Sequence, residues 1–97
     1  MSYLVFCTFD LKNASSKEYI DAYADLEALG LKRVHKDKGK ESVIPTTAAM
    51  GFFTGTDASK VCTHIRDAVT KSFKARGFKS ELFFVVGNDW AWVGAVT

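Results

Sequence analysis

The first ten residues carry the feature that most constrains the fold, a strand pattern without a polar face. Successive strand side chains point to opposite sides. One side is wholly apolar: Tyr3, Val5, Cys7 and Phe9. The other is uncharged up to its last position: Leu4, Phe6, Thr8 and then Asp10. A sheet with one solvated face would show polar residues at alternate positions. Both faces of this strand must therefore be covered, and its only charge stands where the strand ends.

Two amphipathic helices are predicted further along the chain. A serine at 15 and a glutamate at 18 have the capping-box spacing, and the helix that they open ends before Gly30. Its apolar stripe comprises Tyr19, Ile20, Tyr23 and Leu26. The second helix begins at Thr56 or Asp57 and ends at Gly77. Its stripe, from Ala58 to Phe73, is the clearest amphipathic pattern in the chain.

Strand patterns occupy the rest: residues 31–36, 46–54, 81–86 and a short one at Trp90 to Val96. The order βαββαβ predicts an α+β, ferredoxin-like antiparallel sheet with two helices on one face and an extra C-terminal strand. Right-handed crossovers place the four main strands in the spatial order 4-1-3-2, with the first strand central. The uncovered face would also be apolar. We therefore expect a homodimer in which two sheets pack face to face.

Length and composition limit the class of protein. Ninety-seven residues, 47% hydrophobic and 25% charged, predict a single globular domain over 1–97. Cys7 and Cys62 both fall on apolar faces, which favours reduced core thiols over a disulfide or a metal pair. No apolar run approaches the roughly 20 residues of a membrane span, and no signal-peptide pattern is present. We expect a cytoplasmic protein that does not associate with membranes.

The net charge of +2 is unevenly distributed. One basic cluster lies in the predicted hairpin region: Lys32, Arg33, Lys36, Lys38 and Lys40. A second lies near the end of the second helix: Lys71, Lys74, Arg76 and Lys79. Such clusters can bind the phosphates of RNA or DNA. The alternative is that they only solvate a hairpin tip and favour a helix C-terminus through its dipole.

Asp10 is the sharpest candidate for chemistry. The chain contains no P-loop, dinucleotide-binding turn, nucleophile elbow or clustered metal ligands. Asp10 ends a central strand, so two copies in a dimer could hold a divalent metal through their carboxylates. The alternative is a turn-forming aspartate that accepts hydrogen bonds from the amides of the following loop.

Three further side chains have two interpretations each. His35, among the basic residues, could transfer protons on RNA or be an ordinary surface histidine. Trp90 and Trp92 could stack on bases or be interface and core aromatics.

Parts of the sequence resemble a known superfamily. The stretch from Tyr3 to Asp10, with a helix that holds Tyr19 and Tyr23, is similar to the small ferredoxin-like CRISPR-adaptation-subunit and VapD-like proteins. The end, from Glu81 to Gly94, resembles their SinR-like branch. The middle, from residue 38 to residue 58, resembles GhoS-type antitoxin endoribonucleases.

The resemblance implies a dimer and, in some members, cleavage of RNA or DNA. In the metal-dependent members the aspartate that ends strand 1 binds Mg²⁺ or Mn²⁺, and here that position is Asp10. Leu11 and Lys12 follow it, where the family often has an aromatic or basic residue and a second polar residue. The resemblance thus implies a homodimeric, nucleic-acid-associated endoribonuclease. Because many relatives are not nucleases, a non-catalytic antitoxin-like module is the alternative.

Overall fold

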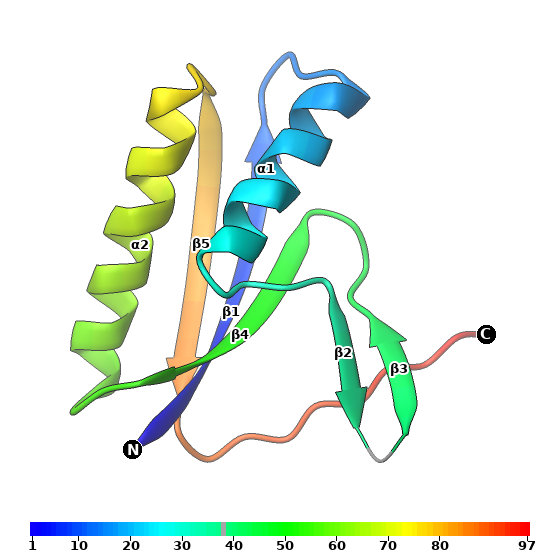
Figure 1. Cartoon of the computed structure of the whole chain (residues 1–97), viewed down its shortest axis with the longest axis vertical. Coiled ribbons are helices and arrows are strands. Elements are labelled where there is room, and N and C mark those ends of the chain that lie inside the picture. The colour runs from blue at the N-terminus through cyan, green and yellow to red at the C-terminus, as the bar shows by residue number, and fades with distance from the viewer. Residues whose placement is uncertain (38) are drawn as a thin grey trace.

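The computed structural model describes residues 1–37 and 39–97 and has a mixed α+β architecture (Figure 1). In chain order its elements are β1 (Ser2–Leu11), α1 (Ser16–Ala28), β2 (Val34–Asp37), β3 (Lys40–Val43), β4 (Ala48–Thr54), α2 (Ala58–Ala75) and β5 (Ser80–Gly87). Within that part of the chain, neither helix is long and apolar enough to cross a bilayer.

The main sheet has three antiparallel strands in the order β4-β1-β5, so β1 is central as predicted. Cys7 pairs with Ala49 on one side and with Phe84 on the other. The predicted strand at 31–36 joins this sheet only through an isolated bridge between Lys32 and Met50. Its remainder forms β2, which pairs with β3 in a separate hairpin. A partner close in sequence, β3, replaces the more distant partner β4, because closing a short loop costs less entropy.

The predicted C-terminal strand at Trp90 to Val96 is wrong, because none of these residues adopts strand structure. The chain instead leaves β5 and runs across the molecule to the β2–β3 hairpin (Figure 1). The ring of Trp90 lies 5.4 Å from that of Phe52 in β4, and the ring of Trp92 lies 5.8 Å from that of His35 in β2. Contacts between aromatic rings thus hold this segment, residues 88–97 (the tail). They take the place of the backbone hydrogen bonds of the predicted strand.

The core lies between the sheet and the helices, both of which cover the same face (Figure 1). The alternate residues of β1 on this face are all buried: Tyr3, Val5, Cys7, Phe9 and Leu11. Leu26 of α1 and Phe73 of α2 are fully buried against them. Ile20, predicted to lie in the apolar stripe of α1, is instead 66% exposed.

Both cysteines are free, as predicted, but Cys62, which was predicted to be a core thiol, is only half-buried. Cys7 lies in the core, and burial raises the pKa of its thiol to about 12. The raised pKa keeps this thiol protonated and unreactive near neutral pH, because the thiolate is the nucleophilic form. Its role is therefore to fill space in the core.

The opposite sheet face, which we call the open face, is apolar as predicted. Leu4 and Phe6 of β1 lie on it half-buried. Three neighbours on the adjoining strands are more exposed: Phe52 at 44%, Phe83 at 62% and Val85 at 51%. The register places Val85 beside Phe6 and Phe83 beside Thr8. Large apolar side chains therefore continue across β1 and β5 without a helix over them, while the tail packs on Phe52 and lies beside Phe6 and Met50 at the other end of this face.

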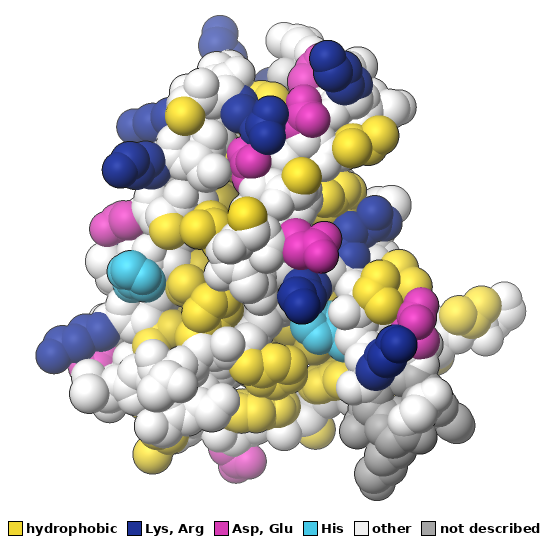
Figure 2. Space-filling model, in the orientation of Figure 1, with side chains coloured by type: hydrophobic (Ala, Val, Ile, Leu, Met, Phe, Trp, Pro, Cys, Tyr) yellow, Lys and Arg dark blue, Asp and Glu magenta, His cyan; other side chains and the backbone are white. Residues whose placement is uncertain are grey.

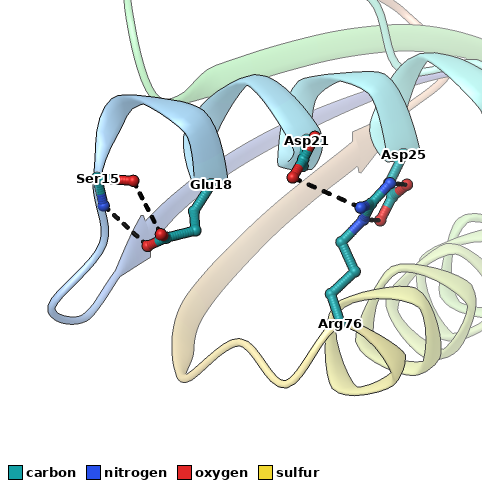
Figure 3. Close-up of polar contacts among 5 residues, drawn as sticks. All are labelled: Ser15, Glu18, Asp21, Asp25 and Arg76. Carbon is teal, nitrogen blue, oxygen red and sulfur yellow. Dashed lines mark hydrogen bonds and ion pairs between the residues drawn. The ribbon is translucent and has the colours of Figure 1, made fainter.

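Polar contacts fix the start and the middle of α1 (Figure 3). At its start, the Glu18 carboxylate accepts hydrogen bonds from the backbone N–H and the hydroxyl of Ser15, which confirms the predicted capping box. Further along, the Asp25 carboxylate accepts two hydrogen bonds from Arg76, at 2.7 and 2.8 Å. Asp21 adds an ion pair to the same guanidinium at 3.6 Å. Arg76 therefore joins the C-terminal end of α2 to the middle of α1.

We expect Arg76→Gln to destabilise the protein at neutral pH but much less in acid. The hydrogen bonds from Arg76 hold the pKa of Asp25 below its ordinary value of 3.8. A carboxylate whose folded pKa is lowered contributes stability above its unfolded pKa, and that stability is lost as the pH falls through the folded pKa. Thermal melts across pH should show a gap between variant and wild type that closes as the pH falls through the lowered pKa of Asp25. The exposed Lys71→Gln is the control. A gap that is constant with pH would contradict this assignment.

Candidate functional site at the end of the central strand

Asp10 lies at the penultimate position of β1, exposed at the edge of the open face. Strand β5 brings Glu81 directly opposite it. Side chains that oppose each other in an antiparallel pair have Cβ atoms roughly 5 Å apart. Two carboxylates therefore meet at the end of the sheet. Two like charges in this arrangement repel each other, and a bound cation would relieve that repulsion.

Tyr19 of α1 positions the Asp10 carboxylate. Its hydroxyl lies 3.1 Å from an Asp10 carboxylate oxygen and 3.2 Å from the Leu11 carbonyl, either of which can accept its proton. The same hydroxyl oxygen accepts a hydrogen bond from the Leu11 N–H at 3.1 Å. The partner of Asp10 is thus a side chain on the helix, where the alternative interpretation expected amides of the following loop.

Glu81 is a candidate that the sequence alone did not identify. Its role as a neighbour of Asp10 depends on the register of β1 with β5, which no local pattern reveals. Lys12 lies 3.0 Å from a Glu81 carboxylate oxygen, and both side chains are well exposed. Accepting this hydrogen bond, Glu81 raises the pKa of Lys12. The Glu81 carboxylate therefore already has one cationic partner within the chain.

A shallow hollow of about 490 Å³ adjoins the two carboxylates. Thr8 and Thr47 line it together with Phe83. The Thr8 hydroxyl donates to the Thr47 carbonyl at 3.1 Å, and Thr47 has a positive φ of 66°. A left-handed conformation is unusual for a β-branched residue. Thr47, which falls within the predicted strand at 46–54, therefore lies just before β4, in the wall of this hollow.

His35 does not join Asp10 within one chain. Its ring lies 6.1 Å from that of Phe52, which pairs with Leu4 at the other end of β1. Asp10 is six residues beyond Leu4, which corresponds to about 20 Å along a strand. The Nε2 atom of His35 is 2.9 Å from the Lys32 carbonyl. The two predicted catalytic residues therefore occupy separate parts of the protomer.

The predicted basic cluster is only partly described. Lys38 lies outside the described residues, as does the side chain of Lys40. Lys32 is exposed at its bridge to Met50, and Lys36 is exposed on β2. Arg33 is half-buried, with its guanidinium carbon 4.0 Å from the centre of the Tyr23 ring. That distance is typical of a cation–π contact, so Arg33 contributes to packing as well as to charge.

Charges on the helix side of the molecule are mixed (Figure 2). Basic and acidic side chains alternate over that face without forming one large patch of either sign. Of the basic residues near the end of α2, Arg76 is engaged by Asp25 and Asp21. The second predicted basic cluster is therefore partly neutralised by α1.

Among residues 1–37 and 39–97, no three His, Cys, Asp or Glu side chains lie close enough together to hold a metal ion. A single protomer offers the pair Asp10 and Glu81, and such a pair is common for Mg²⁺ sites that complete their coordination with water and substrate phosphates. Comparison with models of protein families, with curated proteins and with solved structures finds no match.

Proposed function

We propose that this protein is a homodimeric, nucleic-acid-associated endoribonuclease that uses Mg²⁺ or Mn²⁺ at Asp10. The observation that carries the proposal is the pairing of Asp10 with Glu81 across two strands at the exposed end of the sheet. Carboxylate oxygens are the ligands that these hard cations prefer. A metal bound there would lower the pKa of a coordinated water and so supply a nucleophile near neutral pH. Tyr19 would hold Asp10 in place, and Lys12 would share Glu81 with the cation.

The fold that we propose is ferredoxin-like. The order β5-β1-β4, with Lys32 bridged to the outer edge of β4, corresponds to the spatial order 4-1-3-2. In this arrangement the strand next to β4 is reduced to one bridge and continues as a hairpin. Two free cysteines suit a reducing compartment, which supports a cytoplasmic location.

The homodimer would form through the part of the open face around Phe83 and Val85, which the tail leaves exposed, and Phe83→Asp should disrupt it. A charge at this 62% exposed position would be buried against the partner sheet, and burying an unpaired charge is costly. Sedimentation at micromolar concentration should show a dimer for the wild type and a monomer for the variant. Ile20→Asp is the matched control, because Ile20 is equally exposed (66%) but lies on α1. A monomeric wild type would rule out this dimer.

Cleavage should depend on both the metal and Asp10. Labelled RNA incubated with Mg²⁺ or Mn²⁺ should be cut, EDTA should stop the reaction, and Asp10→Asn should reduce it to background. Labelled DNA in a parallel reaction tests the other substrate. Asp67→Asn is the control, because Asp67 is an exposed aspartate on α2 that is paired with Arg66. Cleavage that survives Asp10→Asn would overturn the catalytic assignment.

One observation favours the alternative, a non-catalytic dimeric interaction or antitoxin-like module. The separation of His35 from Asp10 leaves the carboxylates without a histidine from the same chain. Under this alternative the basic residues would only solvate the surface, the tail would dock a partner protein, and the wild type would form dimers without cutting nucleic acid. The sedimentation and cleavage experiments above distinguish the two functions.

A further inference from the structure

A hollow of about 480 Å³, which we call the α1–hairpin hollow, lies between α1 and the β2–β3 hairpin. Its walls come from one face of α1, from the chain that leads from α1 into β2 (Figure 1), and from both strands of the hairpin. The volume lies within the roughly 300–1,000 Å³ that is usual for small-molecule pockets. None of its lining residues belongs to the hollow beside Asp10 and Glu81. A ligand bound here would therefore be independent of the proposed function.

The walls of this hollow are largely apolar. Ile20 of α1 lines it and is well exposed, although a large apolar side chain on a helix is usually buried. Val34 and Val43 line it from the hairpin, where they pair with each other across the two strands, and they are 45% and 59% exposed. Apolar side chains from two elements thus border a space that none of them fills. A ligand with an apolar body would remove this surface from water, which favours binding.

Arg33 places a cation in the wall of the hollow. It is half-buried, and its guanidinium carbon lies 4.0 Å from the centre of the Tyr23 ring, which lines the hollow as well. The other two arginines of the chain, Arg66 and Arg76, are each paired with an aspartate, whereas no ion pair joins Arg33 to a described side chain. Charges that are partly removed from water are normally compensated by an opposite charge. An anion in the hollow would supply that compensation.

The guanidinium of Arg33 is held in place by packing and keeps donors available. Its Nε atom is buried and has no acceptor among the described residues. The two terminal nitrogens, Nη1 and Nη2, are not enclosed in this way and donate to no residue that the structure describes. Two such nitrogens match the two oxygens of one carboxylate, which gives a strong bidentate contact. Because the Tyr23 ring already restrains the side chain, less rotamer entropy is lost when a ligand binds.

Two further charges in the lining favour an anion with a single negative charge. Lys32 adds a second cation and Glu27 adds one carboxylate. Two cations against one carboxylate leave the hollow with one net positive charge, which a single carboxylate neutralises. A dianion such as a phosphate monoester would also be repelled by Glu27, because like charges in close proximity are unfavourable.

We propose that the α1–hairpin hollow binds a small organic acid that carries one carboxylate on an apolar body. The carboxylate accepts hydrogen bonds from the terminal nitrogens of Arg33. The apolar body packs between Ile20 and the paired valines of the hairpin. Charge selects the head of the ligand, and the exposed apolar walls select its body.

Octanoate and octanamide are matched probes, because they share one hydrocarbon chain and differ in the charge of the head group. In calorimetric titrations at neutral pH, below micellar concentrations, we expect octanoate to bind about tenfold more tightly, since charge-assisted hydrogen bonds are the stronger ones. Octyl phosphate should bind more weakly than octanoate, and acetate, which lacks the apolar body, should not bind. In amide NMR spectra, octanoate should shift the signals of residues 20–34 and 43 and leave those of Phe83 and Val85 on the open face unchanged.

Three variants separate the head of the site from its body. Arg33→Gln should abolish the preference for octanoate over octanamide and leave the affinity for octanamide nearly unchanged. The control Arg66→Gln, at an exposed position on α2, should bind both probes as the wild type does. Ile20→Ala should weaken both probes alike, because Ile20 would contact only the apolar chain.

Equal affinity of the wild type for octanoate and octanamide overturns the carboxylate site. This comparison uses wild-type protein, so it does not depend on whether Arg33→Gln folds. Tighter binding of octyl phosphate than of octanoate overturns the assignment to a monocarboxylate. NMR shifts on the open face in place of the hollow, or no binding of any probe at millimolar concentration, overturn the site as a whole. None of these measurements involves RNA or a metal, so the proposed function stands or fails separately.

Discussion

Gly51→Ala is expected to lower the stability of the protein by about 3 kcal/mol or more, at or above the upper end of overpacking effects. A Cβ atom at this position would lie 2.1 Å from the carbonyl oxygen of Gly30. The obstacle is backbone, so no side-chain rotation can relieve the clash. Gly30 itself has a φ of +93°, and the neighbouring Lys32–Met50 bridge has hydrogen bonds of 2.8 and 2.9 Å in both directions. Relief would therefore require breaking the link between the first crossover and β4.

A matched glycine provides the control for this prediction. Gly87 ends β5, its φ is ordinary, and an added Cβ would meet no atom within 4 Å. Gly87→Ala should stay within about 0.5 kcal/mol of wild type. Urea or thermal unfolding should show a fall in melting temperature of more than about 10 °C for Gly51→Ala alone. Similar melting temperatures for both variants would show that the approach of Gly30 to Gly51 is not tight in solution.

Phe73→Ala is expected to cost about 3–5 kcal/mol, a large share of the total stability of a domain of this size. The Phe73 side chain is 1% exposed. Its ring lies 5.8 Å from Phe9 and 5.5 Å from Phe78, in edge-to-face arrangements with both. Truncation would leave a cavity where α2 meets β1 and the chain that follows the helix. Denaturant unfolding measures the loss directly.

Two further variants keep this prediction testable if Phe73→Ala fails to fold. Phe73→Leu retains most of the volume and should cost about 1 kcal/mol. Phe83→Ala removes the same ring from the open face, where the side chain is 62% exposed, and should be nearly neutral in the monomer. In a dimer its cost should depend on protein concentration, because association stabilises the folded state. A Phe73→Leu variant as stable as wild type would contradict a closely packed core at this position.

Periodic patterns predicted the elements that bury a regular face. Strand β1 alternates without interruption, and both helices begin and end close to their predicted caps. The buried face of α2 repeats Val61, Ile65, Val69 and Phe73 at helical spacing. Such elements are predictable because each repeats one spacing along its length. The position of Asp10 at the exposed end of the central strand followed from the same pattern.

The remaining features depend on which segments meet in space. Strand β2 pairs with β3 because this partner is close in sequence. The strand propensity of residues 31–36 does not show whether β3 or β4 will be the partner. The tail has aromatic residues at alternate positions, which is a strand pattern, but its rings pack on Phe52 and His35. Ile20 matches the helical spacing, yet its side chain is 66% exposed. Glu81 was missed as a site residue because register is a long-range property.

The topology also determines when the protein can fold as it is synthesised. Strand β1 is synthesised before its partners β4 and β5. Cys7, for example, pairs with Phe84, which lies near the other end of the sequence. Because both pairings are distant in sequence, the central strand has no partner until residues 48–54 have emerged from the ribosome, and it lacks its second partner until residues 80–87 have emerged. During that interval a segment that is apolar on both faces is exposed to other chains. Folding yield should therefore be limited by protection of the first ten residues, a task for chaperones that bind extended apolar segments.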